Sequence, residues 1–127
     1  MIIKFISYLV LFSLSAAGST TLMGDKDMLA GNLLSKEGIL TLIMNWRFYL
    51  AIFLAILSRF TFVLMNSELL KIEYTRNNAT NITTIVSIAS IIVVFFSNYI
   101  FLNEWLTSKQ FVGSVIILFG VWLVLTR

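Results

Sequence analysis

The sequence contains no cysteine, no histidine and no proline, and it has few charged residues. Without cysteine there is no disulfide framework and no thiolate metal site, and without histidine the usual general base and the commonest metal ligand are missing. Only 12% of the 127 residues are charged, against about 25% in an average soluble domain. The 9 Lys and Arg against 6 Asp and Glu are spread along the chain, without the basic stripe that nucleic-acid binding needs. Nor does the sequence show a nucleophile–base pair or a phosphate-cradling glycine loop. We therefore expect no enzyme, no metal, no cofactor and no nucleic-acid partner.

Apolar residues dominate instead, at 59% of the chain, with a mean hydropathy of +0.96. A chain this short cannot bury so much apolar surface in one core, so lipid must solvate the remainder. A helix needs about 20 mainly apolar residues to cross the hydrocarbon layer. Four continuous stretches qualify, at about 5–23, 48–70, 82–102 and 111–126. Spanning strands would alternate over about 10 residues, which these stretches do not. We predict an all-α fold: an integral membrane bundle of four transmembrane helices, with 1–127 as a single domain.

The first stretch has an alternative interpretation as a cleaved signal peptide. Lys4 precedes an apolar run, and small residues follow at 15–18, as such peptides require. We expect the stretch to remain as the first span.

The cationic side chains are balanced between the two sides that four spans define. The side with both termini and the middle connection carries four of them, Lys4, Lys71, Arg76 and Arg127. The side with the other two connections also carries four, Lys26, Lys36, Arg47 and Lys109. Membrane orientation follows the difference in Lys and Arg between loops, and here the difference is zero. Two interpretations stay open: dual topology with antiparallel pairing, or a weak fixed bias set by a partner or by the first helix.

Arg59 lies at the centre of the second stretch. Insertion scales assign a cost of about 2.5–3.5 kcal/mol to an arginine at that depth, so it is a candidate functional residue. Its guanidinium stays charged and matches phosphate or carboxylate oxygens in a bidentate way. Alternatively, Arg59 reaches toward the surface, bonds to carbonyls and to Asn66, or lies nearer one surface because the span is shifted.

Small and hydroxyl residues recur at helical spacing in the other stretches. They line a polar cleft around Arg59 in one interpretation, and they allow close helix packing in the other. The candidate substrate-binding residues are Arg59, Asn98, Ser15, Ser87 and Ser90. Gly113 and Gly120 are seven residues apart on one helical face, which favours a helix contact, either within the chain or between two chains.

Two segments resemble a known family. Residues 102–113, with Glu104, Leu106-Thr107 and Gly113, followed by an apolar run that ends in Gly120-Val121, resemble the last-helix signature of the drug/metabolite transporter superfamily (EamA-like). The length is similar to that of its small four-helix members, the small multidrug resistance proteins and the flippase subunits for undecaprenyl-phosphate-linked aminoarabinose. Residues 18–23 also resemble the first helix of the multidrug proteins, although their essential glutamate corresponds to Ala16 here.

This resemblance implies a transporter that forms a homodimer, or a heterodimer with a similar small subunit. Because Ala16 replaces the glutamate and Arg59 is cationic, we expect a flippase subunit that translocates an anionic lipid-linked substrate, such as a polyprenyl-phosphate sugar. The alternatives are a small multidrug resistance-type exporter of organic cations and a non-transporting membrane subunit that anchors a partner enzyme. The expected location is the cytoplasmic membrane of a bacterium or archaeon.

Overall fold

The computed structural model describes the backbone of residues 2–125 and, among these, all side chains except those of 89, 124 and 125. Thr126, the predicted end of the fourth stretch, and Arg127, one of the eight cations compared above, lie outside the described residues. Within residues 2–125 the regular structure is helical and contains no strand.

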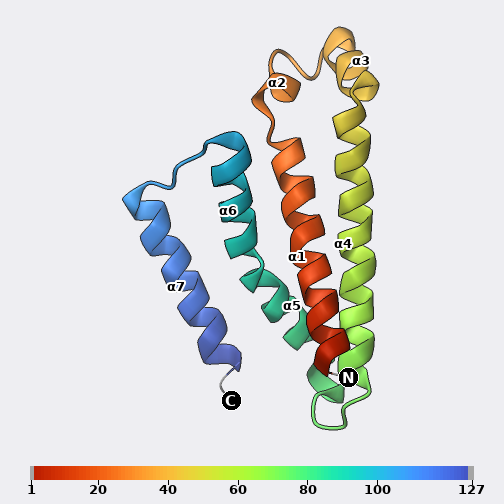
Figure 1. Cartoon of the computed structure of the whole chain (residues 1–127), viewed down its shortest axis with the longest axis vertical. Coiled ribbons are helices and arrows are strands. Elements are labelled where there is room, and N and C mark those ends of the chain that lie inside the picture. Colours follow the sequence, from red (N-terminus) through yellow and green to blue (C-terminus); the bar gives the residue numbers. More distant parts are fainter. Residues whose placement is uncertain (1, 126–127) are drawn as a thin grey trace.

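The centre of the bundle is an antiparallel pair of long helices, α1 (Ile2–Met23) and α4 (Trp46–Leu70) (Figure 1). Their shared face is built from small and hydroxyl side chains, which let two helices approach closely. Its buried members include Ser15, Ala17, Ser19, Ala51, Ser58 and Thr61. The Ser19 hydroxyl donates to the Ala51 carbonyl across the interface at 2.9 Å. Large apolar side chains such as Ile56 and Val63 point outward, where lipid solvates them.

Two short helices connect this pair at one end of the molecule, α2 (Lys26–Leu29) and α3 (Lys36–Met44). Each begins at a side-chain cap, because the Asp25 carboxylate accepts from the Asp27 amide and the Ser35 hydroxyl accepts from the Gly38 amide. An ion pair between Asp25 and Arg47 ties the end of α1 to the start of α4.

The third predicted stretch is divided into two helices, whereas the sequence predicted one over 82–102. After the short turn η1 (Arg76–Asn78), α5 (Ala79–Ala89) leads to a bend at Ser90 and then to α6 (Ile91–Leu102). The Ser87 hydroxyl donates to the Thr84 carbonyl at 2.7 Å, and the Ser90 hydroxyl donates to the Ser87 carbonyl at 2.6 Å. Such bonds to the preceding turn bend helices.

The last helix, α7 (Ser108–Leu125), follows an exposed connection. Asn103 ends α6 in the left-handed conformation, with φ 53°, which asparagine tolerates better than most residues. Thr107 and Gln110 then form a reciprocal cap. The Thr107 amide donates to Gln110 Oε1 at 2.9 Å, and the Gln110 amide donates to Thr107 Oγ1 at 3.4 Å.

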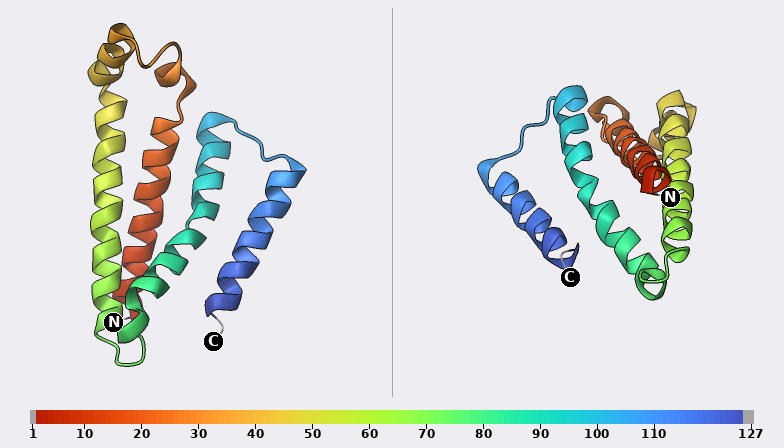
Figure 2. Two further views of the ribbon diagram at one scale, coloured as in Figure 1. Left: turned by 180° about the vertical axis from the view of Figure 1, so that it is seen from behind. Right: turned by 60° about the horizontal axis from the view of Figure 1, so that its bottom comes forward.

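The two halves of the bent stretch have different neighbours. α6 packs against α1, while α5 contacts α4 and α7. α1 therefore lies between α4 and α6, and α7 stands at the outer edge of the bundle (Figure 2).

Three helical segments of the described chain are long and apolar enough to cross a membrane: Ile2–Met23, Trp46–Leu70 and Arg76–Leu102. The apolar helix Ser108–Leu123 is shorter. The protein is thus an all-helical bundle with the apolar helices of an integral membrane protein. The fourth crossing, by α7, stays a prediction.

Candidate functional site

Arg59 lies near the middle of α4, 13 residues after its start at Trp46 and 11 before its end at Leu70. At about 1.5 Å per residue, its Cα is about 20 Å and about 16 Å from the two helix ends. The predicted central position therefore holds within the helix as the structure defines it.

A groove of about 480 Å³ runs between α1 and α4 beside Arg59. Its lining residues are Phe12, Ala16, Ser19 and Thr20 from α1, with Ile52, Ala55, Ile56, Ser58 and Arg59 from α4. None of these described lining residues is acidic. The groove is apolar along most of its length, with hydroxyl groups and one guanidinium as its polar atoms.

The Arg59 guanidinium forms no hydrogen bond and no ion pair with any described residue, and its side chain is exposed. The alternative in which Asn66 binds Arg59 is wrong, because the Asn66 amide donates to the Thr80 hydroxyl at 3.2 Å instead. The arginine is thus available to a ligand that enters the groove.

Ala16 lies in the same groove as Arg59. The resemblance to the multidrug proteins predicts a glutamate here, and the groove is lined at this point by the methyl group of Ala16 and by the cation of Arg59. The charge of this groove favours an anion over a cation.

The structure does not gather the other predicted substrate-binding residues around Arg59. The Ser15 hydroxyl donates to the Leu11 carbonyl at 2.6 Å and is buried. Ser87 and Ser90 bond to carbonyls of their own turn at the α5–α6 bend. None of these three serines lines the Arg59 groove, so the structure does not bring them together with Arg59, and their contact with a substrate stays a prediction.

Asn98 takes part in a different polar cluster, between α6 and α1. The Thr21 hydroxyl donates to Asn98 Oδ1 at 2.9 Å. Thr21 Oγ1 also lies 2.8 Å from Ser97 Oγ, and since Thr21 has a single hydroxyl proton, Ser97 donates to Thr21. An unpaired polar group is costly in an apolar medium. These bonds avoid that cost, because they pair the polar side chains inside the contact between α1 and α6.

Gly113 and Gly120 of α7 face open space. A Cβ atom built on either would meet nothing within 4 Å among the surrounding atoms. The structure therefore does not support the alternative in which these glycines pack against another helix of the same chain.

Sequence reasoning missed the burial of Glu68. Glu68 is only 7% exposed, although it lies in the last turn of α4. Its carboxylate forms an ion pair with Lys71. The spacing of three residues between the two charges was the available signal, because such residues are neighbours on a helix. Glu68 does not line the Arg59 groove, and its charge is already matched.

Comparison with known protein families matches residues 28–126, which is 99 of the 127 residues, to the EamA-like transporter family. The matched region contains Arg59, the bend at Ser90 and the whole signature from Glu104 to Gly120. No curated protein and no solved structure matches the chain. Members of this family are membrane transporters rather than enzymes, in keeping with the apolar helices described above. The chain belongs to the EamA-like transporter family.

Proposed function

We propose that the protein translocates an anionic lipid-linked substrate, such as a polyprenyl-phosphate sugar, and that Arg59 binds the phosphate in the groove between α1 and α4. The observation that carries this proposal is the exposed Arg59 side chain, which has no described partner in the middle of an apolar helix.

An arginine at this depth in an apolar helix is costly. Insertion scales give about 2.5–3.5 kcal/mol for an arginine at a helix centre, and no described side chain or carbonyl binds the guanidinium. A phosphate that enters from the bilayer would offset this cost through charge-assisted, bidentate hydrogen bonds. The apolar walls of the groove would meanwhile accommodate the first part of a lipid tail.

The cation-exporter alternative needs a carboxylate that exchanges protons for substrate inside the membrane. The described lining of the groove offers none, and Ala16 stands where the resemblance places one. Glu68 is nine residues beyond Arg59, about two and a half turns of helix away, and is paired with Lys71. Arg59 would repel a cationic cargo.

The proposal includes pairing through α7, with a second copy or a similar small subunit. α7 contacts α5 and leaves its glycine face open. Alternating access would then arise as α1, α4 and the α5–α6 pair move against α7. No coupling ion is assigned, so transport would follow the substrate gradient.

The test is native mass spectrometry of the detergent-purified protein with decaprenyl phosphate and, separately, with a quaternary ammonium compound. We expect selective retention of the phosphate lipid and at least a tenfold loss of retention in Arg59→Leu. Arg59→Lys should keep part of the binding, because a lysine retains the charge but not the planar fork. Arg76→Leu, which removes an exposed arginine outside the groove, is the matched control and should bind normally.

Retention of the ammonium compound alone, unaffected by Arg59→Leu, would contradict the proposal and favour the cation exporter. Binding of neither compound, with assembly into a larger complex intact, would favour the anchoring subunit.

A further inference from the structure

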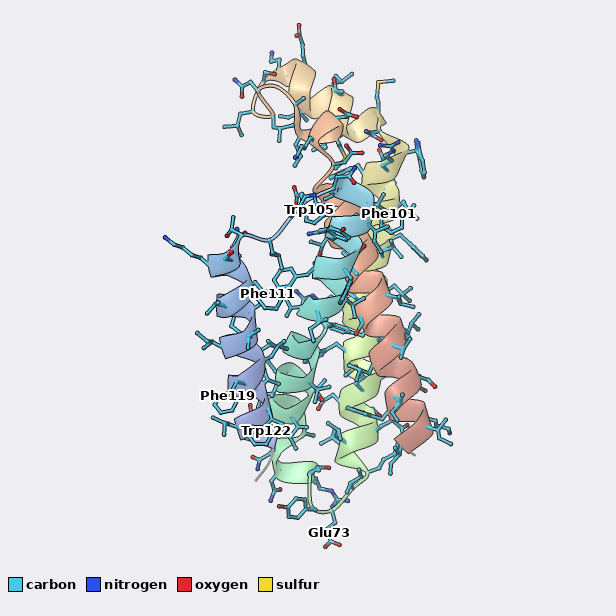
Figure 3. The ribbon with its side chains drawn as sticks, turned by 60° about the vertical axis from the view of Figure 1, so that its left-hand side comes forward. Glu73, Phe101, Trp105, Phe111, Phe119 and Trp122 are labelled. Carbon is cyan, nitrogen blue, oxygen red and sulfur yellow. The ribbon has the colours of Figure 1, made fainter. Side chains whose placement is uncertain are left out.

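A second hollow, of about 580 Å³, lies at the end of the molecule where α6 gives way to α7. Its lining residues are Lys26, Phe95, Asn98, Asn103, Glu104, Trp105, Leu106 and Gln110. It shares no residue with the Arg59 groove, which is lined by α1 and α4 alone. Figure 3 shows Trp105 where the connection leaves the end of α6. The hollow is therefore a separate feature at one end of the helical bundle.

Two amide side chains in this hollow are held by their oxygen atoms. Asn98 Oδ1 accepts from Thr21, and Gln110 Oε1 accepts from both the amide and the hydroxyl of Thr107. Their NH₂ groups have no described partner. Each amide is thus fixed in orientation by its oxygen while its two N–H donors stay available to a ligand.

An aromatic face and an acceptor complete the hollow. Trp105 is 76% exposed, and its ring packs against Tyr99 edge to face, with centroids 4.7 Å apart. This contact orients the indole and leaves much of its surface free. The Glu104 carboxylate makes no ion pair with any described residue, and it provides acceptor oxygens.

The charges of the hollow cancel. Lys26 is its one cation and Glu104 its one anion among the described lining residues. A strongly charged ligand would therefore find no net attraction here, in contrast to the Arg59 groove. A neutral ligand with many hydroxyl groups fits better, because the hollow combines N–H donors, carboxylate acceptors and an aromatic surface.

We propose that this hollow binds a neutral hexose head group, with its apolar C–H face against Trp105. The N–H donors of Asn98 and Gln110 would bind hydroxyl oxygens, and the Glu104 carboxylate would accept from a hydroxyl. The inference goes beyond the phosphate site, since the hollow shares no lining residue with the Arg59 groove. It rests on the proposed function only for the idea that the head group belongs to a transported lipid.

The test uses neutral lipids, so that phosphate binding cannot produce the result. Protein in nanodiscs is offered monohexosyl diacylglycerol and diacylglycerol in equal amounts, and the retained lipids are counted by native mass spectrometry. We expect about a tenfold preference for the hexosyl lipid, which is lost in Trp105→Ala and reduced several-fold in Glu104→Gln. Trp105→Phe should retain part of the preference, since a ring remains. Trp46→Ala, which removes another exposed tryptophan outside the hollow, should change nothing.

Arg59→Leu should leave the hexosyl preference intact, so failure of the phosphate site and failure of this site are distinguishable. Equal retention of the two lipids by the unmodified protein would overturn the inference. So would equal losses in Trp105→Ala and Trp46→Ala, because the tryptophans would then act as interface anchors.

Discussion

Thr20 and Thr21 are neighbours in α1, and their hydroxyl groups have different roles. Thr20 is exposed in the Arg59 groove and donates to the Ala16 carbonyl of its own helix at 2.8 Å. Thr21 is buried and bonds to Ser97 and Asn98 of α6. One residue along a helix is a rotation of about 100°, so adjacent threonines serve two different contacts.

We predict that Thr21→Val destabilises the fold by about 1–2 kcal/mol, because Asn98 and Ser97 lose their shared partner in an apolar contact. The β-branched shape is kept, so packing should change little. Thr20→Val should cost less than about 0.5 kcal/mol, since it removes only a bond within one turn. Unfolding titrations of both variants in mixed micelles measure the difference, and equal losses would argue against the Thr21 cluster as a stabilising contact.

At this scale the sequence was informative about Arg59 and uninformative about its surroundings. The sequence alone reveals a charged residue in an apolar stretch and its distance from the ends of that stretch. That Ala16 lines the same groove depends on how α1 rotates against α4, which small side chains decide jointly. Likewise, spacing places Ser15, Ser87 and Ser90 on helical faces, but it does not reveal which groove those faces line.

Among the elements, α7 begins three residues earlier than the sequence analysis placed it, at Ser108 instead of 111. The cause is the cap between Thr107 and Gln110, whose spacing of three residues is the signature of a capping box. This signal was present in the sequence, within the segment that resembles the transporter signature. That part of the segment therefore has a structural role as well.

We expect the double variant Thr107→Ala, Gln110→Ala to fray the first turn of α7, because the first amide groups of the helix lose their acceptors. Loss of a cap costs about 1 kcal/mol. Hydrogen exchange at residues 108–111 should accelerate about fivefold. Ser114→Ala removes only a bond to the Gln110 carbonyl and serves as the control; unchanged exchange in the double variant would show that the cap does not hold the helix start.

The bend at Ser90 is the element that sequence reasoning did not predict. Hydropathy is continuous across 82–102, and no proline or glycine interrupts it. The break comes from hydroxyl groups that bond back to carbonyls at Thr84 and Ser87. A serine hydroxyl in an apolar helix can donate to a carbonyl of its own helix or to a group on a neighbouring helix, and the sequence does not reveal which of these bonds forms.

Across the whole molecule, the order of apolar helices was predictable from hydropathy, but their arrangement was not. α1 lies between α4 and α6, and α7 contacts α5 at the edge of the bundle. Large side chains of α7 such as Phe111, Ile116 and Phe119 are more than half exposed. In a bilayer, lipid or a second subunit covers such a face.

We predict that Gly113→Leu with Gly120→Leu abolishes pairing and leaves the single chain folded. A Cβ built at either position meets no atom of another helix within 4 Å, so the leucines have open space inside the chain, whereas a close helix pair requires small residues there. Cross-linking in native membranes should shift from dimer to monomer with unchanged thermal stability. Val115→Leu is the control on the same helix, and a dimer that persists in the glycine variant would place the interface elsewhere.

α1 begins and α7 ends at the same end of the molecule (Figure 1). Two copies joined head to tail by a short linker would therefore insert in the same orientation. Joining two copies in opposite orientations would require an additional membrane crossing between them. A tandem fusion thus selects parallel pairs over antiparallel ones, and whether it transports like two separate chains would decide between dual topology and a single orientation.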